Sequence, residues 1–285
     1  MRYILLVLIF SATLFGGVLK STIISVNEDK TEATIKIKNI DIGVNGFVVH
    51  SIEGEHNMIL NNAVVTKFDK NTKIATLNLS EYTALRNNAL PSGKWSVKVG
   101  DKVILAFGYT RGVLIAPSEE IYYRITRHSK LQWVHPDIFA TILSFNGHPT
   151  PLREDFTKLS IASSVGLLYI FLDKRLYTID SKSFKILTVI EADLLQDETH
   201  LPFYTRVPEI DADWWGEGSD ELEYYEPHYY TLLAEANSNN KTLYDIIKAK
   251  DKKLKDEDAD DDDRYEDALE YFEGMQNLTI EDEIW

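Results

Sequence analysis

The sequence predicts a mainly β protein with an α+β portion: a duplicated β-unit forming a small barrel or sandwich, then a small α+β domain, then an acidic, partly helical tail. Alternating β-rich segments followed by mixed helix and strand patterns lead to the first two parts. The acidic tail is predicted from the uneven distribution of charge. The residues from Leu195 onward include 27 acidic and 8 basic side chains, whereas residues 1–194 include 18 acidic and 22 basic side chains. The predicted parts are residues 1–16, 17–116, 117–195 and 196–285.

Residues 1–16 have the composition of a secretory signal peptide. Arg2 supplies the positive start, the apolar run Tyr3–Leu14 is too short to span a bilayer, and Gly16 and Gly17 are small enough for cleavage. A buried N-terminal strand or helix is the alternative. We therefore expect an exported protein, periplasmic or associated with the cell surface, and without a membrane span.

The first domain contains an internal repeat. Ser25–Ile37 (SVNEDKTEATIKI) resembles Lys67–Leu79 (KFDKNTKIATLNL), which aligns Thr34 with Thr76. Each copy is followed by a glycine-containing turn and an apolar strand, at residues 45–49 and 100–104. The repeat predicts a duplicated β-unit that closes on itself, with chance resemblance between two amphipathic hairpins as the alternative.

The segment Val97–Ala116 predicts a hairpin at the centre of this barrel or sandwich. Val103–Phe107 is almost uninterrupted in its apolar character, as a strand buried on both faces would be. Gly108 and Gly112 then flank a short polar turn, and the chain is apolar again up to Ala116.

Residues 117–195 predict a compact α+β unit. Two helices are expected, over residues 138–145 and 152–164, and three antiparallel strands, over residues 167–172, 176–179 and 186–190. Because turn signals and apolar periodicity are densest before Leu195, we expect residues 18–195 to fold without the tail.

Residues 196–285 predict an acidic, aromatic arm. Apolar spacing favours helices over Thr242–Leu254 and Tyr265–Glu273. The run Asp256–Asp263 between them is too like-charged to stay compact and is predicted to be disordered. Its alternating carboxylates resemble the start of a calcium loop, but Asp261 stands where such a loop requires glycine.

Patterns for catalysis and for cofactor binding are missing from the sequence. The chain has no cysteine, its seven histidines form no HExxH motif, and it contains neither a phosphate-binding loop nor GxGxxG. We therefore predict a protein that is not an enzyme, with no cofactor and no metal site. The acidic tail also disfavours nucleic acid and anionic lipid.

Two sets of side chains are candidates for binding a protein partner. The first is a series of aromatic residues among carboxylates, which would either dock on a partner or fix the arm to the basic body of the same chain. The second is the lysine-rich segment Lys248–Lys255. The candidate residues are Trp214, Trp215, Tyr224, Tyr225, Tyr229, Tyr230, Lys250, Lys252, Lys253 and Lys255.

The signal-like start, the β repeat with Val99-Gly100-Asp101, and the block from Gly166 to Asp180 resemble the N-terminal domain of plasminogen-binding surface proteins from spiral, polar-flagellated bacteria. The resemblance covers about residues 18–195. It implies binding of plasminogen, whose kringles capture lysine, ideally at a chain terminus. This sequence ends in Trp285, so only Lys248–Lys255 could imitate such a ligand.

These observations favour an exported, non-enzymatic binding or adaptor protein of the bacterial envelope. Its partner would be a host plasminogen-like protein or a component of an envelope scaffold. The alternative is a structural subunit of a periplasmic assembly such as a flagellar-motor disk. The sequence indicates no oligomeric state.

Overall fold

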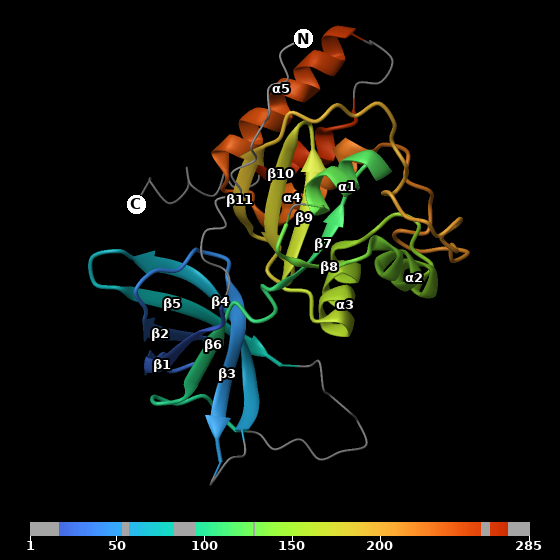
Figure 1. The fold of residues 1–285 in the computed structure, drawn as a ribbon. Coiled ribbons are helices and arrows are strands. Elements are labelled where there is room, and N and C mark those ends of the chain that lie inside the picture. The colour runs from blue at the N-terminus through green and yellow to red at the C-terminus, as the bar shows by residue number, and fades with distance from the viewer. Residues whose placement is uncertain (1–16, 53–56, 83–94, 128, 258–262, 273–285) are drawn as a thin grey trace.

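The computed structural model describes residues 17–52, 57–82, 95–127, 129–257 and 263–272. The predicted signal peptide, most of the Asp-rich run and the C-terminal Trp285 lie outside these residues. A β-barrel lies at one end of the molecule, and a five-stranded sheet with its helices lies at the other (Figure 1).

The barrel is closed and antiparallel, with strand order β1-β2-β5-β4-β3-β6. Buried residues alternate along β2 and β5, so one side of each strand fills the interior. This confirms the predicted duplicated β-unit and identifies it as a barrel. Its strands are β1 (Leu19–Val26), β2 (Glu32–Lys36), β3 (Asn45–Ser51), β4 (Asn57–Asp69), β5 (Ile74–Glu81) and β6 (Lys102–Leu105).

The repeat in the sequence corresponds to an approximate two-fold symmetry of the barrel. β2 pairs with β5 so that Thr34 lies opposite Thr76, the residue with which it aligns. β3 pairs with β6 so that Val48 lies opposite Val103, again at matching positions of the two copies. An antiparallel pairing centred on equivalent residues places a local two-fold axis between them.

The irregularities of the barrel also repeat. The pairing of β1 shifts between Ile23 and Ser25, and that of β4 shifts between Val65 and Lys67. The alignment of the two copies places these shifts at the same position. A bulge bends and twists its strand, so both copies turn the barrel wall at the same point.

The second sheet is mixed, with strand order β11-β10-β9-β7-β8. β9, β10 and β11 form the antiparallel meander that the sequence predicts, while β7 runs parallel to both β8 and β9. Its strands are β7 (Arg111–Ile115), β8 (Gln132–Val134), β9 (Leu167–Leu172), β10 (Arg175–Asp180) and β11 (Ile186–Glu191).

The predicted hairpin over Val97–Ala116 is wrong, because β6 and β7 belong to different sheets. Both sides of β6 are already paired, with β1 and with β3, so no place remains for β7 in the barrel. The chain leaves the barrel through a turn in which Ala106 and Gly108 have φ of 57° and 80°. Gly108 then packs closely against Gly166, because a Cβ on Gly166 would lie only 2.5 Å from the carbonyl carbon of Gly108.

Helices pack on both faces of the sheet: α1 (Glu119–Thr126), α2 (Pro136–Asn146), α3 (Arg153–Ser163), α4 (Tyr225–Ala236) and α5 (Lys241–Glu257). The predicted helices over 138–145, 152–164 and 242–254 correspond to α2, α3 and α5. Residues 266–272 are also helical, as predicted. Helices α1 and α4 and strand β8 were not predicted from the sequence. Helix α4 includes Pro227, which the helix accommodates in its first turn, where a missing N–H leaves no hydrogen bond unmade.

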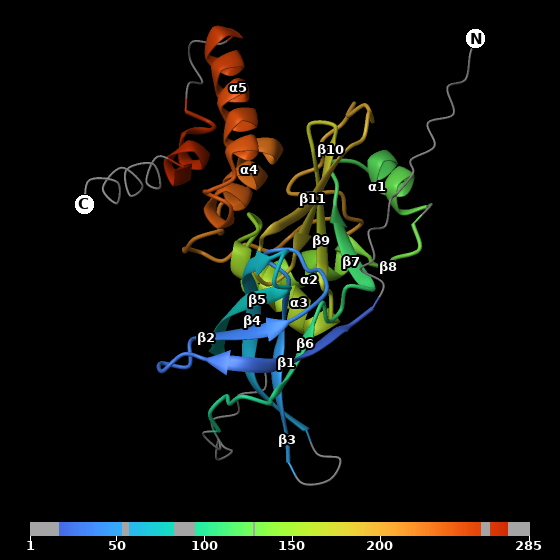
Figure 2. The same ribbon diagram turned by 90° about the vertical axis from the view of Figure 1, so that its left-hand side faces the viewer.

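The two faces of the sheet contribute to two separate hydrophobic clusters. On β9, Leu168, Ile170 and Leu172 pack with α2, α3, α4 and α5. The alternate residues Tyr169 and Phe171 pack with α1 and with the barrel interior. Figure 2 shows α4 and α5 on one side of the sheet and α1 on the other. The tail helices therefore complete one face of the sheet.

Candidate protein-binding surface

The loop between the sheet and α4 is anchored to α2 by a charged contact. The Arg206 guanidinium lies 2.6 Å from Asp137 in the first turn of α2, and Thr205 Oγ1 donates to the same carboxylate at 2.9 Å. Partial burial favours the protonated carboxyl, but the bonds from Arg206 and Thr205 outweigh it and lower the pKa of Asp137 to about 2. The start of the loop is therefore fixed by a carboxylate that stays ionised.

Further along, the loop follows the end of α2. The Asp211 amide donates to Ser144 Oγ at 3.1 Å, and the Asp213 amide donates to the Gly147 carbonyl at 3.0 Å. Gly147 ends α2 with φ of 71°, and a Cβ there would lie 2.4 Å from Asp213 Cγ. Glycine is thus required both for the helix end and for the approach of the loop. On the other side, the Thr150 amide donates to the Gly218 carbonyl at 3.1 Å.

Two tryptophans occupy the loop between these anchors. Trp214 is 101% exposed and Trp215 is 87% exposed. Phe145, in the last turn of α2 beside the anchored loop, is 91% exposed. Because large exposed apolar side chains are typical of interaction sites, these three residues are candidates for contact with a partner.

The stretch of sequence around the two tryptophans carries charge of one sign. Residues 207–224 include seven acidic side chains and no lysine or arginine. We name Phe145, Trp214, Trp215 and the acidic residues of 207–224 the acidic aromatic face. Rings with carboxylates around them suit a partner that is basic and also offers apolar or cationic groups to the ring faces.

The candidate tyrosines have a different location. Tyr225, Tyr229 and Tyr230 are buried in the cluster that joins α4 to the sheet. The Tyr225 hydroxyl donates to the carbonyls of Ile115 and Phe171, both at 3.2 Å, and burial raises the pKa of all three tyrosines. These side chains hold the arm to the body of the chain, as the alternative interpretation expects. Tyr224 is 38% exposed, with the Arg264 guanidinium 4.0 Å from its ring centroid.

The candidate lysines are also divided between structural and exposed positions. Lys250 Nζ lies 2.7 Å from Glu226 and 3.5 Å from Asp173, so it ties α5 to α4 and to the sheet. Lys255 pairs with Asp251 at 3.4 Å. Lys252 and Lys253 are exposed on α5.

Phe145 is the member of the acidic aromatic face that sequence reasoning missed. The buried residues of α2 are Pro136, Phe139, Ala140 and Leu143, which share one side of the helix. Phe145 does not follow their spacing, so an apolar residue at this position is expected to face solvent. The helical phase of α2 was the signal that could have identified it.

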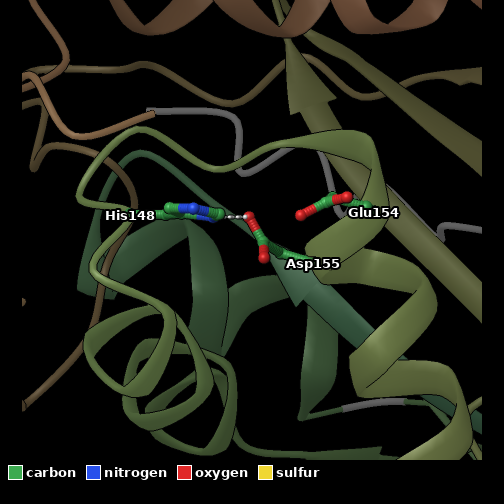
Figure 3. A group of neighbouring side chains, drawn as sticks. All are labelled: His148, Glu154 and Asp155. Carbon is green, nitrogen blue, oxygen red and sulfur yellow. Dashed lines mark hydrogen bonds and ion pairs between the residues drawn. The ribbon is translucent and has the colours of Figure 1, made fainter. Parts of the chain in front are cut away.

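A second group of polar side chains, His148, Glu154 and Asp155, lies at the start of α3 (Figure 3). His148 Nδ1 is 2.9 Å from Asp155 Oδ2. The buried Asp155 carboxylate also accepts from the Leu152 amide at 2.9 Å and from Asn146 Nδ2 at 2.8 Å. The Asp155 carboxylate therefore caps the start of α3, and helix capping accounts for the positions of these three side chains.

The fold and this surface define a barrel-and-sheet protein that presents a rigidly anchored acidic aromatic loop. The model of the family described as plasminogen-binding protein pgbA N-terminal matches residues 18–233, and the chain belongs to that family. This confirms the resemblance found in the sequence.

Curated relatives named plasminogen-binding protein PgbA occur in two strains of Helicobacter pylori. They are 30% and 29% identical over 200 residues, which make up 68% of this chain and 43% and 42% of the relatives. The chain therefore spans less than half the length of the relatives it matches. No solved structure matches. Among the described residues, none of the helices has the length and apolar character required to cross a membrane.

Proposed function

We propose that this chain is an exported, non-enzymatic binding protein of the bacterial cell envelope, and that it binds plasminogen or a plasminogen-like protein through the acidic aromatic face. The name of the relatives supports the kind of partner. The near-complete exposure of Phe145, Trp214 and Trp215 is the observation that carries the choice of surface. Aromatic side chains of this kind supply most of the affinity at many interfaces.

The extent of the family match favours the acidic aromatic face over the lysines of α5 as the binding site. The match covers residues 18–233, which include the whole face, and it ends before α5 begins at Lys241. The face is also held in place by hydrogen bonds on both sides of the tryptophans, so binding would cost little loop entropy. Its carboxylates would raise the rate of association with a basic partner.

Replacing both tryptophans (Trp214→Ala with Trp215→Ala) is expected to raise the Kd for plasminogen at least tenfold, since each aromatic anchor contributes on the order of 2 kcal/mol. The melting temperature should stay within about 2 °C of the wild type, because neither ring is buried. Surface plasmon resonance with immobilised plasminogen and the full chain measures the first quantity, and thermal unfolding measures the second.

The matched control is the double change Lys252→Gln with Lys253→Gln on the exposed side of α5. It should leave the Kd unchanged, and free lysine should not displace the chain. If free lysine competes and the lysine variant loses binding, the kringles of plasminogen bind the lysines of α5, and the acidic aromatic face is not the site. A lower melting temperature with unchanged binding in the tryptophan variant would mean that the loop is an internal strap.

Export predicts a specific N-terminus. The charge of Arg2 and the short apolar run after it support cleavage near Gly16. Edman or mass-spectrometric sequencing of the chain from an envelope fraction should find a start at or just after that residue. A chain that still begins at Met1 in this fraction would contradict the proposal.

The second candidate is a structural subunit of a periplasmic assembly such as a flagellar-motor disk. The match covers less than half of the relatives, so their named activity can depend on parts outside the matched region. Crosslinking in intact cells separates the two candidates. Capture of an envelope component through the acidic aromatic face, without any affinity for plasminogen, would favour the scaffold.

A further inference from the structure

A cleft separates the barrel from the start of the mixed sheet. It consists of two adjoining hollows with volumes of about 130 and 210 Å³. Both are lined by Asn45, Tyr82, Ile161 and Lys182, which come from the barrel, from α3 and from the turn after β10. Junctions between domains are common sites for small ligands.

Lys182 is the charged side chain of this cleft. Its Nζ lies 4.2 Å from the centroid of the Phe47 ring. Burial lowers the pKa of Lys182, and the nearby charge of Asp180 opposes that effect. Among the described residues no ion pair joins the Lys182 ammonium to a carboxylate. Within the described part of the chain, this half-buried ammonium therefore has no direct ion-pair partner, although the charge of Asp180 acts on it from a distance.

The residues around Lys182 leave room for an anion. The described lining of the two hollows includes no aspartate or glutamate, although the whole chain has a net charge of −15. Asp180 is fully buried and is not among the lining residues. Its oxygens accept hydrogen bonds from the amides of Lys182 and Ser183, from the Asn45 amide and from the Tyr109 hydroxyl. Its carboxylate is thus occupied by other donors.

The rest of the lining combines polar side chains, such as Ser160, Ser164 and Thr157, with an aromatic and aliphatic part. The Phe47 ring contacts the rings of Tyr82 and Phe107 edge to face, with centroids 5.5 and 5.6 Å apart. Phe107 is 49% exposed and Ile161 is 48% exposed, so apolar surface of the cleft faces solvent. An ammonium at the edge of an aromatic wall suits a molecule with one negative charge and an apolar body.

We propose that this cleft binds a small carboxylate with an aliphatic or aromatic body. The carboxylate pairs with Lys182 Nζ, and the body lies against the exposed parts of Phe107 and Ile161. A single lysine, with no arginine in the lining, matches one negative charge. The site is separate from the acidic aromatic face and does not depend on plasminogen binding.

The probe for this site is phenylacetate, and phenylacetamide is its uncharged counterpart of the same shape. Both are titrated against the full chain, with binding followed by calorimetry and by chemical shifts. Phenylacetate should bind saturably, and its affinity should fall at least tenfold in Lys182→Met. Phenylacetamide should bind at least tenfold more weakly than phenylacetate to the wild type.

The Lys182→Met variant should fold, because methionine keeps most of the stem and removes a partly desolvated charge. Lys252→Met, on the exposed side of α5, is the matched control and should keep the affinity of the wild type. Three results would overturn the proposal: equal affinity in Lys182→Met, equal affinity for the amide, or no saturable binding of phenylacetate up to about 10 mM.

Discussion

A chain that ends at Asp193 is expected to lose cooperative unfolding. Residues after this point supply a large part of the cluster on one face of the sheet, and each large apolar side chain contributes about 1.5–3 kcal/mol on burial. Their sum exceeds the total stability of about 5–15 kcal/mol typical of a domain. The members that would be lost include Phe203, Tyr225, Tyr229, Tyr230, Leu232, Leu233, Leu243, Ile247, Tyr265 and Phe272.

Thermal unfolding followed by circular dichroism measures this effect. A chain ending at Phe272 is the control, because it keeps every residue of the cluster and should unfold cooperatively. The sequence led to the opposite expectation, that residues 18–195 fold without the tail. If the shorter chain unfolds cooperatively at the melting temperature of the full chain, residues 18–195 fold without the tail and the prediction made here is wrong.

Replacing Asp180 with alanine is expected to lower the free energy of unfolding by about 3–5 kcal/mol. The Asp180 side chain is fully buried and accepts hydrogen bonds from three parts of the chain. Tyr109 donates to it at 2.5 Å and the Asn45 amide at 3.1 Å, while Ser183 on the turn after β10 donates at 2.8 Å. Without the carboxylate, the Tyr109 hydroxyl and the Asn45 amide are buried and unsatisfied, at a cost of about 1–3 kcal/mol each.

Asp193→Ala is the matched control for this measurement. The Asp193 side chain is 73% exposed and pairs with Lys174 at 2.9 Å, so its loss should cost less than about 1 kcal/mol. Urea unfolding of the three proteins compares the free energies. If Asp180→Ala and Asp193→Ala cost the same, the contact between barrel and sheet does not depend on the buried carboxylate.

The barrel was the part of the fold most accessible to sequence reasoning. A repeat of turn and strand patterns in the chain corresponds to pairings centred on Thr34 and Thr76, because equivalent sequences form equivalent strands. The mixed sheet was less accessible. Its antiparallel meander has local turn signals. The parallel contacts of β7 have none, because α1 separates β7 from β8, and α1, α2 and α3 separate β7 from β9.

The segment around Gly108 shows that local sequence patterns do not determine which strands pair. Two apolar runs separated by glycines fit a hairpin and also fit a crossing from one sheet to another. The choice depends on β6 being paired on both sides, which only the closed barrel reveals. Helix α4 was missed for a related reason, since its aromatic residues and Pro227 resemble an irregular arm until the sheet is present to bury them.

The candidate surfaces were partly predictable. The exposed pair Trp214 and Trp215 could be identified from their acidic surroundings, whereas Tyr225, Tyr229 and Tyr230 in the same arm are buried. Periodicity within α4 was the available signal for that difference. The cleft around Lys182 was not predictable, because it forms where residues of the barrel meet α3 and the turn after β10.

The strand order of the barrel has a consequence for the time at which it forms. β3 pairs with β4 and β6, both from the second copy of the repeat, and β6 pairs with β1 and β3, both from the first. The third strand of each copy, β3 or β6, thus pairs only with strands of the other copy, so neither copy can form its part of the barrel alone. The barrel cannot close until the chain has been synthesised as far as Leu105. Folding then depends on contacts between distant segments, which slows it relative to a protein built from local hairpins.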